Sequence, residues 1–177
     1  MVGNSGSGKT SLAAALAERL GIPHLELDSV FHQPGWQPLD EDEFRDRVRA
    51  AVAADSWVMD GNYRAVREII WARADTIVWL DLPRRVVTRR IIGRTLRRVA
   101  RRQELWNGNR ERWRNLMTLN PQESVIVWSI TKHGHYRRQF GEIFESGTHG
   151  SAAVVRLRSA AAVREFLQRY AEPPGRG

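Results

Sequence analysis

An eight-residue segment near the start of the chain constrains the fold more than any other feature. Residues 3–10 read Gly-Asn-Ser-Gly-Ser-Gly-Lys-Thr, which matches the P-loop pattern G-x-x-x-x-G-K-[ST] at every fixed position. Glycines let such a loop turn back on itself, so that successive N–H groups form a concave anion-binding surface at the start of a helix. The segment therefore predicts a loop that wraps the phosphates of a nucleotide.

The residues after this loop favour a helix over a flexible Gly/Ser linker. Leu12, Leu16 and Leu20 recur at helical spacing, and Gly21 with Pro23 supplies a stop signal. In a P-loop the lysine reaches the β- and γ-phosphates, and the hydroxyl of the next residue ligates Mg²⁺. The predicted nucleotide-binding residues are Gly3, Asn4, Ser5, Gly6, Ser7, Gly8, Lys9, Thr10 and Ser11.

Length and composition indicate one compact domain over residues 1–177. The chain contains no cysteine, which excludes disulfides and thiolate metal sites and fits a reducing compartment. No apolar run approaches the roughly 20 residues of a membrane span, and a signal-peptide profile is missing. We expect a cytoplasmic monomer that does not enter membranes, with a flexible tail at 172–177.

Positive charge is concentrated in one part of the chain. The net charge is +8, and only Lys9 and Lys132 are lysines among 28 basic residues. Residues 84–114 contain twelve arginines against Glu104 and Glu111. A basic segment of this kind suits either phosphate contacts around a nucleotide or a solvated helix face.

Short apolar runs alternate with helical patterns along the chain. Strands are predicted at 24–28, 57–61, 76–80 and 153–157, and helices at 41–54, 84–102, 111–119, 121–144 and 160–170. Such alternation predicts an α/β fold with a parallel sheet covered on both faces. Only two residues precede the P-loop, so we expect either that the chain starts several residues upstream or that its first strand is shortened. Three of the runs end in acids, at Asp28, Asp60 and Asp81, where ligands bind in parallel sheets.

Two further segments resemble the nucleoside monophosphate kinases, which include adenylate kinase. Residues 60–64 read Asp-Gly-Asn-Tyr-Arg and are similar to the family's D-G-F-P-R, and residues 90–94 are similar to its R-I-x-G-R at the start of the lid. The chain also resembles small bacterial adenylate-kinase-like P-loop proteins labelled DNA topology modulation proteins. That likeness rests on residues 27–36, 60–63 and 105–112.

This resemblance implies a three-layer P-loop NTPase fold whose five-stranded parallel sheet has the strand order 2-3-1-4-5. Helices would flank the sheet, residues 29–54 would bind an acceptor, and an arginine-rich helical lid would lie at 95–120. The implied reaction is transfer of the γ-phosphate of Mg-ATP, with GTP less favoured, to a nucleotide or another small acceptor. Asn62 and Tyr63 replace the family's Phe-Pro, so specificity for AMP does not follow.

The same resemblance and the chemistry of phosphoryl transfer suggest individual roles. An in-line transfer needs cations around the transferred group more than covalent catalysis. The expected catalytic residues are Lys9, Arg64, Arg90, Arg94 and Asp28. We expect Thr10 to bind Mg²⁺ and Asp60 to support the metal, with Asp81 and Asp28 as alternatives to Asp60.

Two other functions stay open at this point. The basic segment could attract a nucleic-acid backbone, with ATP as a regulatory ligand. A poorly sealed lid would instead give a weak NTPase.

Overall fold

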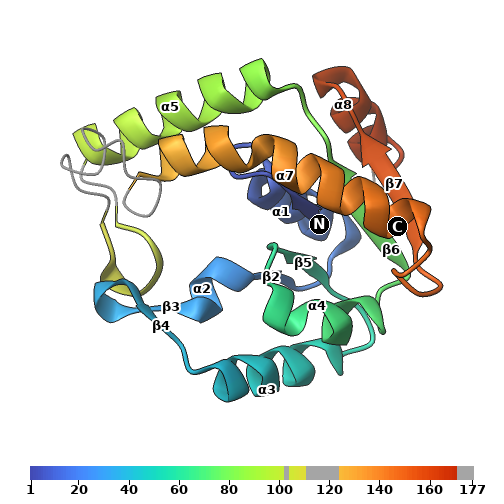
Figure 1. Ribbon diagram of the computed structural model, residues 1–177. Helices are drawn as coiled ribbons and strands as arrows, with labels where there is room; N and C mark the ends of the chain where they lie inside the picture. The colour runs from blue at the N-terminus through green and yellow to red at the C-terminus, as the bar shows by residue number, and fades with distance from the viewer. Residues whose placement is uncertain (102–103, 111–123, 171–177) are drawn as a thin grey trace, which may run out of the picture.

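A computed structural model describes residues 1–101, 104–110 and 124–170 (Figure 1). The expected helix at 111–119, part of the expected lid and the tail at 172–177 lie outside the described residues.

Helices and short strands alternate along the described chain. In order, the elements are β1 Val2–Gly3, α1 Lys9–Leu20, β2 His24–Glu26, α2 Leu27–Phe31, β3 His32–Gln33, the 3-10 helix η1 Pro34–Trp36, β4 Gln37–Pro38, α3 Glu41–Val52, β5 Val58–Asp60, α4 Arg64–Trp71, β6 Thr76–Leu80, α5 Arg84–Ala100, the 3-10 helix η2 Trp106–Gly108, α7 Val125–Glu145, β7 Ala153–Leu157 and α8 Ala160–Gln168. The strands predicted at 76–80 and 153–157 are confirmed as β6 and β7.

The expected five-stranded parallel sheet is wrong. The described residues form a parallel three-stranded sheet in the order β1-β6-β7, a parallel pair β2-β5 and a short antiparallel pair β3-β4. The physical reason is the length of β1, which pairs with β6 through only two residues. On its other edge β1 is joined to β5 only through the backbone of Met1, which is too few residues for a ladder.

The two parallel sheets nevertheless meet at Met1. The amide of Gly61 donates to the Met1 carbonyl over 3.3 Å, and the Met1 amino group donates to the carbonyl of Met59. These contacts bring the end of β5 beside the start of β1. Residues 3–10 therefore lie beside Glu26 and Asp60, the last residues of β2 and β5.

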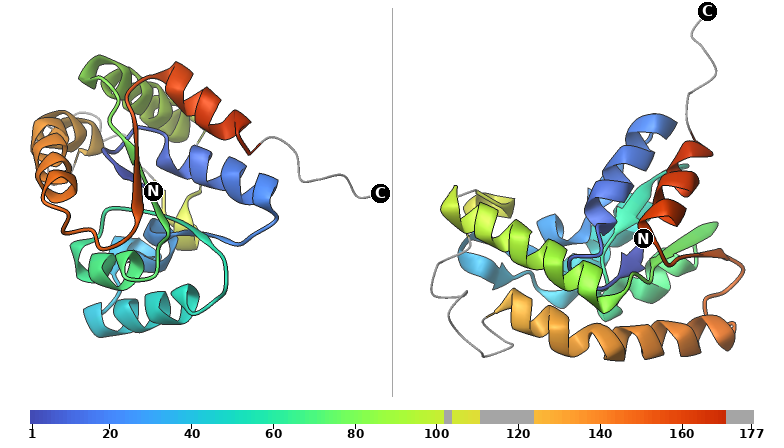
Figure 2. Two further views of the ribbon diagram at one scale, coloured as in Figure 1. Left: turned by 90° about the vertical axis from the view of Figure 1, so that its right-hand side faces the viewer. Right: turned by 90° about the horizontal axis from the view of Figure 1, so that it is seen from above.

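Both faces of the β1-β6-β7 sheet are covered by helices (Figure 2). Side chains of β6 alternate between the two faces: Val78 and Leu80 pack with α1 and α8, whereas Ile77 and Trp79 pack against Phe140 of α7. This period of two is the pattern expected of a strand buried on both sides.

A second core lies under the β2-β5 pair. Helices α3 and α4 bury Phe44, Val48 and Val66 against Leu27 and Met59. Figure 1 shows these two helices on the opposite side of β2 and β5 from α5 and α7. This core fixes the segment in which the acidic residues lie.

Side-chain caps explain several helix boundaries. Ser159 accepts a hydrogen bond from the Ala162 amide at the start of α8, and Asp40 accepts from two amides at the start of α3. Within the described ranges, none of the helices combines the length and apolar composition needed to cross a membrane.

Candidate phosphate-binding site

The predicted P-loop connects β1 to α1 (Figure 1). Gly6 and Gly8 adopt positive φ angles of 83° and 97°, a region that side-chain-bearing residues rarely enter, and Gly8 is the N-cap of α1. The positive end of α1 therefore faces the concave side of the loop, where it favours an anion.

Lys9 is held by its own loop. Its Nζ donates to the carbonyl oxygens of Gly3 over 2.9 Å and Asn4 over 3.2 Å. Burial lowers the pKa of Lys9, and the negative charge of Asp28 is the strongest of the opposing effects. The ammonium group is thus desolvated but close to acids, and a bound phosphate would stabilise its charged form further.

Side chains from two distant elements support the loop. Asn4 Nδ2 donates to the backbone carbonyl of Ser129 over 2.9 Å and to its hydroxyl over 3.1 Å, and this hydroxyl donates to the Ser5 carbonyl over 2.9 Å. On the other side, Asn62 accepts from the Gly3 amide and donates to the Gly3 carbonyl. Helix α7 and the turn after β5 thus fix the loop backbone.

Two polar atoms in the loop are buried and lack a hydrogen-bond partner within the described chain: Asn4 Oδ1 and Ser7 Oγ. Buried polar groups are nearly always paired in proteins. Ser7 is completely buried and Asn4 is 5% exposed, so both atoms are shielded from bulk solvent. Ser11, also predicted for this site, is exposed in the first turn of α1.

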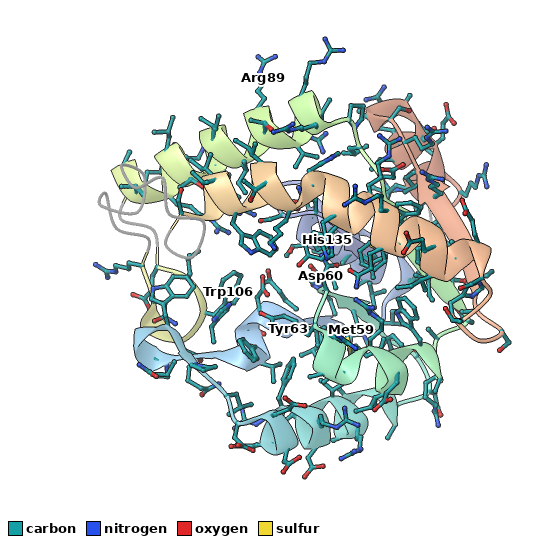
Figure 3. All side chains as sticks on the ribbon, in the orientation of Figure 1. Met59, Asp60, Tyr63, Arg89, Trp106 and His135 are labelled. Atoms are coloured by element: carbon teal, nitrogen blue, oxygen red, sulfur yellow. The ribbon has the colours of Figure 1, made fainter. Side chains whose placement is uncertain are left out.

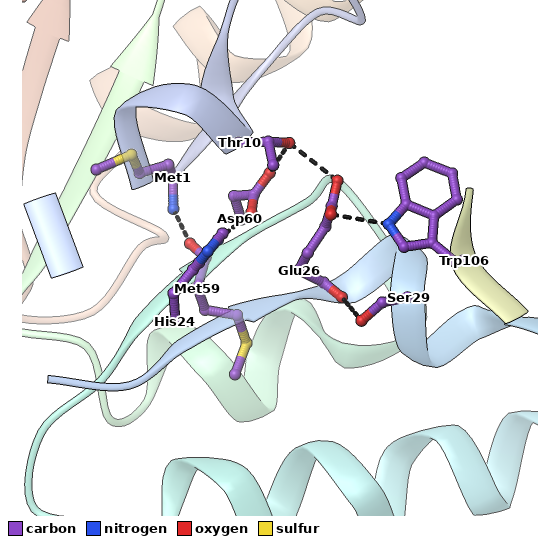
Figure 4. Close-up of polar contacts among 8 residues, drawn as sticks. All are labelled: Met1, Thr10, His24, Glu26, Ser29, Met59, Asp60 and Trp106. Atoms are coloured by element: carbon purple, nitrogen blue, oxygen red, sulfur yellow. Dashed lines mark hydrogen bonds and ion pairs between the residues drawn. The ribbon is translucent and has the colours of Figure 1, made fainter. Parts of the chain in front are cut away.

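Thr10 lies between two carboxylates (Figure 4). Its Oγ1 is 2.8 Å from Asp60 Oδ2 and 3.1 Å from Glu26 Oε1. Glu26 and Asp60 are register partners at the ends of the parallel strands β2 and β5, which explains why their side chains meet. A hydroxyl has one proton, so it can donate to only one of the two acids at a time.

Each acid has a second partner. His24 Nε2 is 2.7 Å from Asp60 Oδ1, and Trp106 Nε1 donates to Glu26 Oε2 over 2.8 Å. Glu26 was missed by the sequence analysis, which placed Asp28 at the strand end. The alternation of His24, Glu26 and Asp28 in one short strand was the available signal.

The donor set fits Mg²⁺ supplied together with a nucleotide. A hydroxyl and two carboxylates are hard oxygen ligands, and Mg²⁺ usually takes one or two carboxylates plus phosphate oxygens and waters. No group of three or more His, Cys, Asp or Glu side chains that could hold a metal is found in residues 1–101, 104–110 and 124–170. A metal here would depend on the phosphates of its nucleotide.

Two of the three arginines predicted to be catalytic lie at the loop. Arg90 Nη1 donates to the Ser7 carbonyl over 3.0 Å, and Arg94 Nη2 is 3.4 Å from Ser5 Oγ. Both come from α5, one turn apart, and α5 crosses the loop closely enough that a Cβ on Gly6 would lie 3.0 Å from the Val87 carbonyl. Arg64 is exposed at the start of α4 and is not brought to the loop.

Asp28 lies in α2 rather than at the end of a strand, which corrects the predicted run at 24–28. Strand β2 ends at Glu26. Asp28 Oδ1 accepts a hydrogen bond from Tyr63 OH over 2.6 Å, and His32 Nε2 is 3.4 Å from the same hydroxyl. Burial and the nearby acids raise the pKa of Tyr63, and burial lowers the pKa of His32.

Residues 104–110 close one side of this acidic region. Asn107 Nδ2 donates to the carbonyls of Ser29 and His32, and Asn109 both donates to the Gln33 carbonyl and accepts from the Trp36 amide. Asn107 has a positive φ of 55°, which asparagine tolerates better than most residues. We name these four bonds the asparagine clasp.

Asp81, the alternative metal acid, is engaged elsewhere. Arg156 donates to Asp81 Oδ2 through Nε and Nη2 at 3.0 and 2.7 Å, and Arg137 Nε lies 3.2 Å from Oδ1. Asp81 therefore joins β6 to β7 and α7 in an ion-pair cluster. Its carboxylate oxygens are occupied by arginines.

Comparison of the chain with known proteins gives no match to any protein-family model and none to any curated protein.

Proposed function

We propose that the protein binds Mg-ATP at the P-loop and transfers the γ-phosphate to a small acceptor. The observation that carries this proposal is the position of Thr10, whose hydroxyl lies within 3.1 Å of both Glu26 and Asp60 at the first turn of α1. A P-loop hydroxyl beside strand-end acids is the arrangement that Mg²⁺ and nucleotide phosphates require.

In this proposal the loop amides and Lys9 hold the phosphate chain. Lys9 exchanges its two carbonyl contacts for phosphate oxygens, while Arg90 and Arg94 lie over the same loop and neutralise charge as the bond to the leaving group breaks. Bound Mg²⁺ supplies further charge neutralisation, with Thr10, Glu26 and Asp60 as the residues that would hold it.

Lys9 offers a direct test, because Lys132 is the only other lysine and lies exposed on α7. We expect Lys9→Ala to lower the affinity for Mg-ATP at least about tenfold and to abolish transfer, because it removes a cation that contacts phosphate. Lys132→Ala is the matched control and should bind like the wild type. Calorimetric titration with Mg-ATP, Mg-GTP and ATP plus EDTA measures both donor preference and metal dependence.

Several results would count against the proposal. Failure of the folded wild-type protein to bind either nucleotide would remove its basis. Equal binding by the Lys9→Ala and Lys132→Ala variants would show that any nucleotide binds elsewhere. Nucleotide turnover that releases only inorganic phosphate across a broad acceptor panel would favour the weak NTPase instead.

A nucleic-acid-binding protein regulated by ATP is the second candidate, supported by the outer face of α5. Arg84, Arg85, Arg89, Arg97 and Arg101 are exposed, and within the described residues no acidic partner is found for them. Figure 3 shows Arg89 extending away from the body of the protein. Exposed guanidinium groups in this density can neutralise several backbone phosphates.

Salt dependence distinguishes this candidate from the kinase. Duplex DNA binding should be measured by fluorescence anisotropy at about 50 and 200 mM salt, with and without Mg-ATP, because phosphate contacts weaken steeply over this range. Binding that persists at the higher salt and responds to Mg-ATP favours the second candidate. Binding that disappears at the higher salt favours a solvated helix face.

A further inference from the structure

The acid nearest to the predicted acceptor region suggests the chemical class of the acceptor. Resting on the phosphotransferase function above, we propose that the acceptor is an uncharged hydroxylated small molecule, such as a nucleoside or carbohydrate, whose reacting hydroxyl gives its proton to Asp28. The alternative suggested by the resemblance is a nucleoside monophosphate, whose attacking group is itself a phosphate.

Tyr63 orients the Asp28 carboxylate. Tyr63 OH donates to Asp28 Oδ1 over 2.6 Å, which fixes one oxygen and leaves Oδ2 without a protein donor among the described residues. The negative charge of Asp28 also raises the pKa of Lys9, the residue proposed to hold the transferred phosphate, against the effect of burial. An acceptor hydroxyl bound to Oδ2 would therefore be close to the γ-phosphate.

The charge around Asp28 favours an uncharged acceptor. Glu26 and Asp28 face this region, and burial lowers the pKa of His32, which favours the neutral form of its ring. Arg64, one of the predicted catalytic arginines, is exposed and makes no hydrogen bond to Asp28 or Tyr63. A phosphate bound beside these two carboxylates is disfavoured by like-charge repulsion.

Aromatic side chains pack around His32. The rings of His32 and Trp106 stack with centroids 5.8 Å apart, and Trp36 meets His32 edge-on at 5.3 Å. Figure 3 shows Trp106 and Tyr63 entering the same part of the molecule from two different segments. Clusters of aromatic side chains with a few polar groups are typical of sites for neutral ring-shaped ligands.

His32 supplies one more polar contact. Because Tyr63 OH donates its proton to Asp28, only His32 Nε2 can donate in its 3.4 Å contact with Tyr63, and in that tautomer Nδ1 is an acceptor. Nδ1 is buried and has no hydrogen-bond partner within the described residues. A second hydroxyl on the acceptor would satisfy it, which favours a polyhydroxylated molecule.

The proposed step balances without any further reactant. The acceptor O–H bond breaks and its proton passes to Asp28 Oδ2, while the acceptor oxygen forms a bond to the γ-phosphorus. The bond from this phosphorus to the β,γ-bridging oxygen breaks, and its electron pair leaves with ADP. The products are a phosphate monoester and ADP, and Asp28 returns its proton to solvent.

The test compares two acceptor pools with the full-length protein and Mg-ATP. One pool contains nucleosides, sugars and polyols, and the other contains the corresponding monophosphates, with products detected by ³¹P NMR and mass spectrometry. We expect a phosphate monoester from the neutral pool, at a rate at least about 100-fold above transfer to the phosphorylated pool. Asp28→Asn should lower kcat at least about 100-fold, the usual contribution of a general base, with the Mg-ATP dissociation constant within about twofold of wild type.

Asp46→Asn is the matched control, since Asp46 is exposed on α3 and pairs only with Arg49 in the described structure. Preferred transfer to monophosphates would overturn the inference and leave the phosphotransferase intact. Mg-ATP binding without transfer to either pool, or an Asp28→Asn variant with kcat within about threefold of wild type, would also overturn it. Loss of Mg-ATP binding itself would instead count against the phosphotransferase function.

Discussion

Replacing Ser129 by alanine tests whether α7 holds the P-loop in its binding conformation. The hydroxyl of Ser129 donates to the Ser5 carbonyl over 2.9 Å and accepts from Asn4 Nδ2 over 3.1 Å, and the residue is almost completely buried. The variant loses both bonds of this hydroxyl. Asn4 Nδ2 keeps its bond to the backbone carbonyl of Ser129, so the principal loss is the donor to Ser5.

The size of the effect follows from these contacts. Leaving one buried carbonyl without its donor costs about 1–2 kcal/mol in the free energy of unfolding. For a domain of this size, each kcal/mol lowers Tm by about 2–4 °C, so Ser129→Ala should melt about 2–8 °C below wild type. Because the loop loses part of its support before nucleotide binds, Mg-ATP affinity should fall by about threefold to tenfold.

Thr131→Ala is the control on the same helix. Thr131 is exposed and its hydroxyl donates only within α7, so its removal should change stability by less than about 0.5 kcal/mol. Differential scanning calorimetry gives Tm, and calorimetric titration gives the Mg-ATP affinity. If the two variants melt within about 1 °C of each other and bind Mg-ATP equally, α7 does not support the loop in the way inferred.

Two further substitutions address other parts of the molecule. Asp81→Asn should lower the unfolding free energy by about 2–3 kcal/mol, which is less than the cost of breaking a fully buried ion pair because the arginine partners of Asp81 are partly exposed. The variant should bind Mg-ATP with unchanged affinity. Altered affinity in a variant that stays folded would argue for a role of Asp81 at the metal. Because burial lowers the pKa of His32 below 6.5, the unfolded state binds its proton first as the pH falls, so stability should be retained above about pH 6.5 and decrease below it. Urea unfolding at several pH values should show the unfolding free energy decreasing more steeply with falling pH for wild type than for His32→Gln. Parallel curves for the two proteins would refute the lowered pKa of His32.

The sequence predicted local features well because they depend on local chemistry. The P-loop glycines, the helix that begins at Lys9 and the strand at Thr76–Leu80 are set by backbone freedom and by the alternation of apolar side chains. The prediction of a five-stranded sheet was wrong because a ladder depends on how many residues two strands can pair, and the paired strands lie far apart in the sequence.

The acids illustrate the same limit. Strand β2 stops one residue before Leu27, whose side chain packs so closely against Gly61 that a Cβ there would lie 2.7 Å from Leu27 Cδ1. That contact joins residues far apart in sequence, so the apolar pattern alone could not identify Glu26 as the strand-end acid. Likewise, only the fold reveals that Arg137 and Arg156 form ion pairs with Asp81.

The asparagine clasp has a consequence for engineering acceptor choice. Asn107 and Asn109 bond to backbone groups of residues 29–36. Residues 29–36 and 104–110 therefore form one structural unit, although they lie far apart along the chain. Grafting only one of them from another protein would leave several carbonyl groups without donors. A successful transplant of acceptor preference should require both stretches to be exchanged together.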